Sequence, residues 1–338
     1  MQCSSPHRSL LIICSMLLLT ACSGSYSLVA FEVLEPATLI FPENVSQLLL
    51  LNRLPASHRM FDEEETGDLG TRQLLMLDTL ISNNIFRGLY DVLRDSPIRN
   101  FHWPIWSSER QPELMVKNDI ILAKREVAEL CLKNCSDVIL SLEAFHLDIS
   151  SKQYSLLEGT IFGYNLQLIS KSTWFVYLPE SPRPYDEFEV LDTMVYITGG
   201  DIKTPRPFPS NDMIKRVSHS SGSKYGRHIT PVWEKTERNI YTAYHPSLRK
   251  GSKHTSEGDW EQAYILWNRL SIKGNSRNRA KACFNMAVYF ELEDNLDSAS
   301  YLIDRAIANS DLKLIRSYRE ELDTRMKKNP TIIKQVER

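Results

Sequence analysis

The nearest approach to a catalytic cluster in this sequence is Glu143, His146 and Asp148. An imidazole beside a carboxylate can move protons near neutral pH, as general acid–base catalysis requires. On one strand, however, alternation places His146 and Asp148 on one face and Glu143 on the other. Only the pair can then cooperate, and a hydrogen-bonded or exposed histidine is the favoured interpretation. Because the sequence also lacks metalloprotease, nucleophile-elbow, phosphate-loop and dinucleotide motifs, we predict a non-enzymatic protein with no catalytic residues, no metal and no cofactor.

Cys22 carries the most definite predicted chemistry. The apolar stretch Leu10–Leu19 follows a short segment with one basic residue, Arg8, and reaches only about half of a bilayer's hydrocarbon core. It is therefore typical of a signal peptide and not of a membrane span. Leu19-Thr20-Ala21-Cys22 resembles the lipobox of bacterial lipoproteins. The alternative is an ordinary signal peptide with a chance cysteine.

The lipobox resemblance implies that residues 1–21 are removed and that Cys22 carries palmitate-type lipid chains. Two or three chains hold a protein stably at a membrane, whereas one does not. Residues 22–33 are predicted to be a tether, beginning with the flexible segment Ser23–Ser27. No aspartate directly follows the cysteine, which favours an outer-membrane lipoprotein of the bacterial envelope that faces the periplasm.

The composition is that of a soluble globular body. Of 338 residues, 42% are hydrophobic and 24% charged, and the net charge of −2 gives no reason to expect nucleic acid. Charge is unevenly distributed, since Lys203–His254 contains eleven lysines or arginines and three acidic residues. This segment either meets an anionic glycan, lipid A phosphates or an acidic partner, or is simply a solvated face.

Three cysteines follow Cys22, namely Cys131, Cys135 and Cys283. An odd number leaves at least one unpaired, so no disulfide framework accounts for all of them. Buried apolar roles are expected for Cys131 and Cys135.

The pattern of apolar residues predicts an α+β protein with an N-terminal mixed α/β sheet domain over residues 34–200. The continuous apolar run Gln47–Leu51 is typical of a central strand, and leucines and isoleucines at helical spacing from Leu74 to Leu93 predict a long helix. Strand, helix, strand, helix, strand indicates βαβ units, with an antiparallel extension after Tyr154. The predicted strands are 47–51, 101–106, 138–142, 160–170, 173–177 and 189–198, and the second helix is 120–135.

A proline-rich linker, 201–210, is predicted to separate this domain from a helical region, 211–330, and a tail, 331–338. Thr230-Pro231 combines an N-cap residue type with proline, which predicts a helix through Tyr244. Further helices are expected at 257–271, 278–293, 296–309 and 312–328.

Gly258–Ala263 and Asp294–Ala299 align without a gap, 36 residues apart, and each precedes an amphipathic helix. The segment Lys281–Asp311 resembles a tetratricopeptide repeat, a helix–turn–helix unit of about 34 residues. In such repeats the first helix lines a concave groove. The resemblance therefore implies that a bound protein segment contacts Lys281, Phe284, Val288 and Glu291. For Phe284 and Val288, burial against the neighbouring helix is an equal alternative.

Several short motifs together resemble a family of uncharacterised lipoproteins of the Bacteroidota. Besides the lipobox they are Glu35-Pro36-Ala37 leading into Phe41-Pro42, Leu49–Arg53, Pro231-Val232-Trp233 ahead of Arg238, and Asn285–Val288. The α/β part also looks distantly like the amino-terminal domain of TolB and the curli-secretion lipoproteins. These resemblances imply architecture and location more than mechanism.

The sequence thus leads to one favoured function and one alternative. The favoured one is a membrane-anchored envelope lipoprotein that acts as a non-enzymatic scaffold or assembly factor for an unidentified envelope protein. The alternative is a factor associated with the cell wall or another glycan, either a binding protein or an enzyme, that uses the basic segment 203–254. A hydrolase with an unrecognised site is a third and weaker hypothesis.

Overall fold

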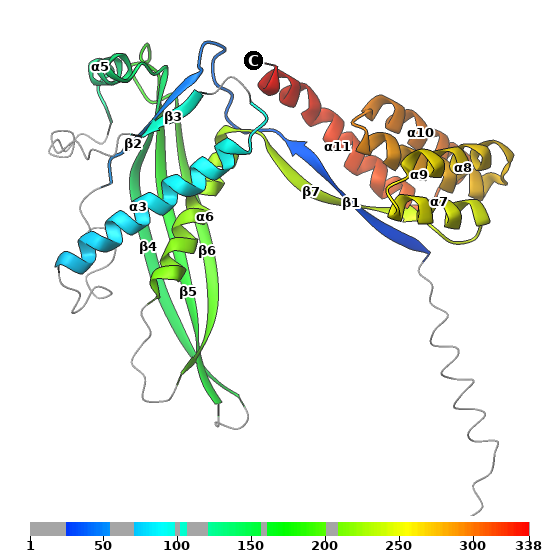
Figure 1. Ribbon diagram of the computed structural model, residues 1–338, viewed down its shortest axis with the longest axis horizontal. Helices are drawn as coiled ribbons and strands as arrows, with labels where there is room; N and C mark the ends of the chain where they lie inside the picture. The colour runs from blue at the N-terminus through cyan, green and yellow to red at the C-terminus, as the bar shows by residue number, and fades with distance from the viewer. Residues whose placement is uncertain are drawn as a thin grey trace, which may run out of the picture. The chain divides into compact units, whose positions relative to one another are not determined.

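The computed structural model describes residues 25–54, 71–98, 102–106, 121–156, 161–200 and 209–337 (Figure 1). The chain divides into two compact units. Among the described residues, those from Leu34 to Val232 and from Thr331 to Glu337 form the sheet unit, and those from Ser25 to Val33 and from Trp233 to Pro330 form the helical unit. The predicted α+β class is confirmed, since a mixed α/β sheet region precedes an all-helical region. Within the described ranges, no helix is long and apolar enough to cross a membrane.

The sheet unit contains a five-stranded mixed sheet in the order β3-β2-β4-β5-β6. The central strand β2 runs parallel to both β3 and β4, and β4, β5 and β6 continue as an antiparallel meander. The parallel core with an antiparallel extension is therefore as predicted, except that one long strand, β5, replaces the two short ones. The bounds are β2 Gln47–Asn52, β3 His102–Trp106, β4 Val138–Leu156, β5 Ile161–Tyr177 and β6 Asp186–Gly200.

Both faces of β2 are buried, which explains its uninterrupted apolar sequence. Leu48 and Leu50 belong to the main core, which contains residues of helices α3 (Thr71–Arg94) and α6 (Asn211–Ile229). Leu49 and Leu51 belong to a second cluster with helix α5 (Lys124–Asn134). Because side chains alternate along the strand, successive leucines pack against helices on opposite faces of the sheet.

A bulge in β4 changes which residues share a face. The pairing of β4 with β5 shifts between Leu142 and Ala144. Leu142 before the bulge and Phe145 after it both enter the main core, although they are three residues apart. Glu143 and His146 consequently share the opposite face, so the prediction that they lie on different faces is wrong. An extra residue in one strand inverts the alternation beyond it.

The boundary between the units differs from the predicted one. Helix α6 packs against α3 and against strands β5 and β6, so it belongs to the sheet unit. The division falls at Val232–Trp233 and not before Asn211. The greater part of the proline-rich segment, residues 201–208, lies outside the described residues.

The helical unit contains a two-stranded sheet of β1 (Tyr26–Glu35) and β7 (Val232–Tyr241). Residues 26–33 are thus part of a strand where a tether was predicted. The helix predicted from Pro231 to Tyr244 is likewise wrong, because Thr230 ends α6 in an extended conformation and β7 follows. Five helices follow: α7 Pro246–Ser256, α8 Trp260–Lys273, α9 Ser276–Leu292, α10 Leu296–Asn309 and α11 Lys313–Val336.

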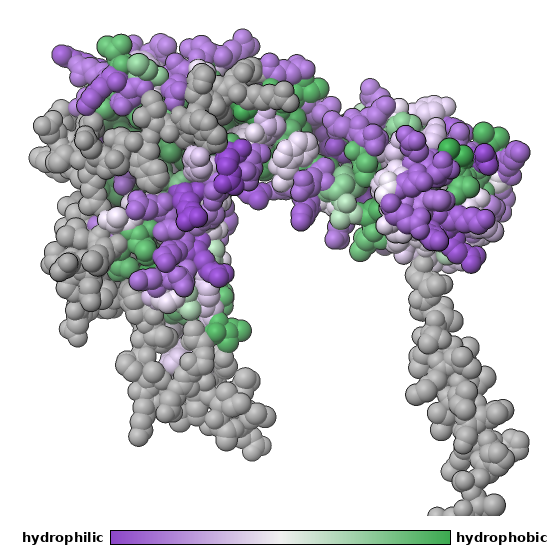
Figure 2. All heavy atoms as spheres, viewed as in Figure 1, coloured by the Kyte–Doolittle hydropathy of each residue, from purple (hydrophilic) through white to green (hydrophobic). Residues whose placement is uncertain are grey.

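Successive helices from α7 to α10 pack against one another, and α9 is buried along most of its length. The core of this unit combines the fully buried Trp267 with Phe284 and Ile303. On the face seen in Figure 2, the coloured surface of both units is mostly hydrophilic, with hydrophobic residues in separate small patches.

Candidate functional site

The site is built on a close crossing of two helices. A β-carbon on Gly222 of α6 would lie 1.8 Å from the carbonyl oxygen of Ile85, and one on Gly88 of α3 would lie 1.9 Å from that of His219. Only glycine permits the two backbones to approach this closely. The crossing fixes the side chains that flank it on both helices.

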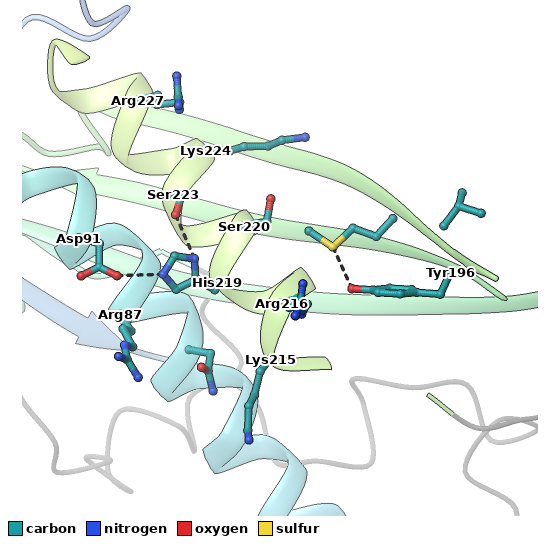
Figure 3. Close-up of a pocket in the computed structure, with 13 residues that line it drawn as sticks. Arg87, Asp91, Tyr196, Lys215, Arg216, His219, Ser220, Ser223, Lys224 and Arg227 are labelled. Atoms are coloured by element: carbon teal, nitrogen blue, oxygen red, sulfur yellow. Dashed lines mark hydrogen bonds and ion pairs between the residues drawn. The ribbon is translucent and has the colours of Figure 1, made fainter. Parts of the chain in front are cut away.

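A cleft of about 980 Å³ lies between α3, α6 and β6 (Figure 3). Helix α6 contributes more than half of its lining, at positions that recur along one side of the helix. The lining residues are Asn84, Arg87 and Asp91 from α3, Met194, Val195 and Tyr196 from β6, and Lys215, Arg216, His219, Ser220, Ser223, Lys224 and Arg227 from α6.

The cleft is strongly basic, with five lysines or arginines and one carboxylate in its lining. Lys215 pairs with Asp212 at 3.1 Å and Lys224 pairs with Asp192 at 2.6 Å. Arg87 and Arg216 form no ion pair with any residue that the structure describes. Two guanidinium groups are therefore available to an anion in the cleft.

A hydrogen-bonded chain links α3 to α6 at the centre of the site. Nε2 of His219 lies 3.0 Å from Oδ2 of Asp91, and Nδ1 lies 3.4 Å from Oγ of Ser223 (Figure 3). The order carboxylate, imidazole, hydroxyl is that of a serine hydrolase triad. However, the Ser223 hydroxyl donates a hydrogen bond to the carbonyl oxygen of Gly88 at 3.2 Å, which is shorter than its contact with His219. We therefore infer that these hydrogen bonds hold the His219 ring in place.

Asp192 of β6 anchors the other side of α6. Its carboxylate accepts hydrogen bonds from Lys224 and from the hydroxyl of Ser220, and only 7% of the residue is exposed. Burial raises the pKa of Asp192, but the bonds from Lys224 and Ser220 outweigh burial and hold this pKa below its ordinary value. Asp192 thus stays ionised and offsets part of the basic charge.

Tyr196 supplies an aromatic wall to the cleft. Burial raises the pKa of its phenol although Arg216 lowers it, so the hydroxyl remains protonated at neutral pH. That hydroxyl makes only a weak hydrogen bond, 3.4 Å to the sulfur of Met194. It is a donor that a ligand can use.

Together these features define a protein with a mixed α/β sheet whose helix layer carries an open basic cleft. Guanidinium, ammonium and hydroxyl donors that converge on one space suit the oxygens of a carboxylate or a phosphate.

Comparison with known proteins places this chain in a family. Residues 45–241 match a family described as a domain of unknown function (DUF8603), and residues 249–324 match a second one, also described as a domain of unknown function (DUF6340). The first match spans more than half of the chain, and the protein belongs to the DUF8603 family. That match contains the whole cleft.

No curated protein matches the chain. Solved structures that resemble it include two of the PelC dodecamer from Paraburkholderia phytofirmans, one of them a point variant. Each is 9% identical and covers 60% of this chain and 99% of its own, with a TM-score of 0.22. A TM-score of that size does not establish a shared fold.

The four residues predicted to contact a bound protein segment are all in the core of the helical unit. Lys281 and Phe284 are 3% and 1% exposed, and Val288 and Glu291 are fully buried. They offer a partner almost no surface, and the burial alternative given for Phe284 and Val288 is the one that this packing supports.

The chain itself covers this face of α9. The ring of Phe284 packs against Tyr241 of β7 and Tyr318 of α11, each with 5.2 Å between ring centroids. The carboxylate of Glu291 pairs with Arg238 of β7 at 3.0 Å and with Arg325 of α11 at 3.2 Å. A repeat leaves this face open, whereas here a strand and a terminal helix fill it.

The other candidate residues remain apart from the cleft. His146 and Asp148 form a pair at 2.7 Å on an exposed part of β4, while Glu143 pairs with Arg53 at 2.7 Å. Burial raises the pKa of Glu143 although Arg53 lowers it. Within the described ranges, no group of three His, Cys, Asp or Glu residues is placed to hold a metal ion.

Cysteine predictions have mixed outcomes. Cys22 lies outside the described residues. Cys131 is buried as expected, but Cys135 is exposed and takes a left-handed conformation at the end of α5.

Sequence reasoning located the basic segment but missed the site within it. Segment 203–254 includes α6, whereas Asp91, more than a hundred residues earlier, completes the hydrogen bond to His219. The available signal was the pair of glycines four residues apart in α6, Gly222 and Gly226, which indicates a helix face in close contact with another element.

Proposed function

We propose that this protein is a membrane-anchored lipoprotein of the bacterial envelope that binds an anionic glycan in the α3–α6–β6 cleft. The observation that carries the proposal is the presence of two arginines, Arg87 and Arg216, without carboxylate partners among the described residues. Lipidation of Cys22, through the lipobox motif, confines the protein to the membrane, and the outer membrane is the expected location.

A glycan with carboxylate or phosphate groups fits the cleft better than a small inorganic anion does. The volume of about 980 Å³ is at the upper end of the range for small-molecule sites, enough for more than one sugar ring. Arginine forks bind planar or tetrahedral oxyanions with two hydrogen bonds. The ring of Tyr196 offers an apolar surface and a hydroxyl donor beside them.

A scaffold function of the tetratricopeptide-like helices is no longer supported by the residues predicted to bind a partner. Its four predicted contact residues are buried against β7 and α11. The helical region still resembles such repeats in its succession of packed helices. Its proposed function is to hold the sheet unit at the membrane. Glycan binding that involves the basic segment 203–254, the alternative in the sequence analysis, is the function that we propose.

The test is binding of the full-length protein to purified peptidoglycan and to soluble acidic oligosaccharides, with a neutral glucan for comparison. The variant is Arg87→Gln with Arg216→Gln. Each hydrogen bond to a charged group contributes roughly 1.5–3 kcal/mol, so loss of one such bond from each arginine is expected to weaken binding by at least about 100-fold. Binding by the wild type is also expected to weaken steeply as salt is added.

The matched control is Arg125→Gln with Lys133→Gln, which removes the same charge from exposed positions on α5. Equal loss of binding in the control would show a general charge effect and refute a site in the cleft. Salt-insensitive capture of one envelope protein, with no glycan bound, would favour the scaffold function instead. Lipidation is checked separately, by the mass of the N-terminal peptide. The mass of the lipid must be present in the wild type and absent in Cys22→Ala.

A further inference from the structure

The start of β1 and the adjoining helix α7 form an exposed surface in the helical unit. Along β1 the side chains alternate, so that Tyr26 and Leu28 point outward and are 47% and 63% exposed. Tyr244, in the turn after β7, is 73% exposed, and its hydroxyl lies 3.0 Å from Oγ of Ser25. Three large exposed side chains therefore lie around the first residue of the strand.

Basic residues lie on the α7 side of the same strand. A pocket of about 320 Å³ lies between residues Ser27–Val29 and α7, and Arg249 and Lys253 are in its lining. The other lining residues of α7 are Ser252, Thr255 and Ser256, each of which carries a hydroxyl. A contact of 3.1 Å between Oγ of Ser27 and Oγ of Ser252 fixes β1 against the helix.

The charge of this surface is only partly compensated. Lys253 pairs with Glu257 at 3.7 Å, but both side chains are more than half exposed, so solvent weakens the pair. Arg249 has no ion pair with the residues that the structure describes. We call the five residues Tyr26, Leu28, Tyr244, Arg249 and Lys253 the β1–α7 surface.

The sequence fixes how far this surface is from a lipid on Cys22. Tyr26 is four residues after Cys22, and four fully extended residues reach about 14 Å at most. Lipid chains on Cys22 would therefore hold the start of β1 within that distance of the membrane. A surface so close to the anchor stays within reach of the lipid headgroups.

We infer that the β1–α7 surface docks on a phospholipid leaflet, an inference that rests on the proposed lipidation of Cys22. Arg249 and Lys253 bind headgroup phosphates at the pocket, and Tyr26, Leu28 and Tyr244 enter the headgroup region. Tyrosine is enriched at membrane interfaces because its ring is apolar and its hydroxyl polar. The contact fixes the orientation of the helical unit on the membrane, which attachment through Cys22 alone would leave free.

The test uses the mature chain from residue 22 with Cys22→Ala, which carries neither the apolar stretch Leu10–Leu19 nor lipid, and vesicles of phosphatidylcholine with or without phosphatidylglycerol. Binding is expected to vesicles with phosphatidylglycerol and to weaken when salt is added. A lysine or arginine near an anionic leaflet adds roughly fivefold to binding, so Arg249→Gln with Lys253→Gln is expected to weaken it about 25-fold. Leu28→Asp, at an exposed position, is expected to reduce binding further without affecting folding.

The control is Lys313→Gln with Arg316→Gln, which removes the same charge from exposed positions of α11 in the same unit. Equal effects of the two double variants would overturn the inference, as would equal binding to vesicles with and without phosphatidylglycerol. Failure of Cys22→Ala to bind, while the lipidated wild type floats with vesicles, would refute the docking surface and leave the anchor intact. Binding by Cys22→Ala without any lipid on the wild-type chain would refute only the anchor.

Discussion

Replacing Gly222 by alanine is the most direct test of the helix crossing that forms the cleft. The added β-carbon would lie 1.8 Å from the carbonyl oxygen and 2.7 Å from the carbonyl carbon of Ile85, and 3.0 Å from the amide nitrogen of Leu89. These are backbone atoms within a helix and cannot rotate away. The closest carbon–oxygen contacts in proteins are about 3.3 Å, so α3 and α6 must separate by roughly 1.5 Å.

Two effects of opposite sign determine the change in stability. Alanine favours the helix over glycine by about 1 kcal/mol. Overpacking in a buried contact costs about 1–3 kcal/mol and sometimes more, and the absence of any movable side chain places this contact at the upper end. We expect a net loss of about 2 kcal/mol in the sheet unit.

Hydrogen exchange is the appropriate assay, because it reports on α3 and α6 separately from the helical unit. A loss of about 2 kcal/mol corresponds to a roughly 30-fold fall in amide protection in both helices. Gly226→Ala is the graded control on the same helix, since its β-carbon would meet the Val92 side chain at 2.8 Å. The reasoning is refuted if Gly222→Ala keeps full protection, or if Gly226→Ala loses more.

Two further predictions concern buried carboxylates. Asp192→Asn is expected to destabilise the sheet unit by about 1–3 kcal/mol at neutral pH, because Lys224 and Ser220 lose an ionised acceptor. Since the pKa of Asp192 is lowered on folding, its contribution is complete above the unfolded pKa near 4 and is lost as pH falls through the lower folded value. The difference between wild type and variant in urea melts must therefore shrink below about pH 4, and a constant difference would contradict the assignment. Glu291→Gln leaves two arginines of the helical unit without their buried partner and is expected to cost about 3–5 kcal/mol, and a circular-dichroism melt superimposable on the wild type would disprove that role.

Local patterns were sufficient for the elements with one strong signal. The apolar run at Gln47–Leu51 predicted a central strand, since a strand covered on both faces needs no polar alternation. The period of leucines and isoleucines in Leu74–Leu93 predicted α3 to within a few residues. The succession of these elements was enough to predict a parallel core with an antiparallel extension.

Local patterns failed where two structures compete for the same residues. Thr230-Pro231 has the residue types of a helix start, yet Thr230 ends α6 and the next residues form β7. Pairing with β1 provides hydrogen-bond partners for this strand, and β1 is about two hundred residues away in the sequence. The bulge in β4 likewise depends on its neighbour β5, so the face of Glu143 was not deducible from β4 alone.

The sequence by itself determined the class of fold, the central strand and its main helix, and the segment where basic charge gathers. Tertiary structure alone decided that α6 joins the sheet unit, that two arginines, a histidine and a tyrosine meet in one cleft, and that α11 covers the predicted groove. The physical reason is that periodicity and capping are local properties, encoded within a few turns of chain. A cleft depends on which distant backbones can approach, and here that depends on glycines whose partners lie more than a hundred residues away.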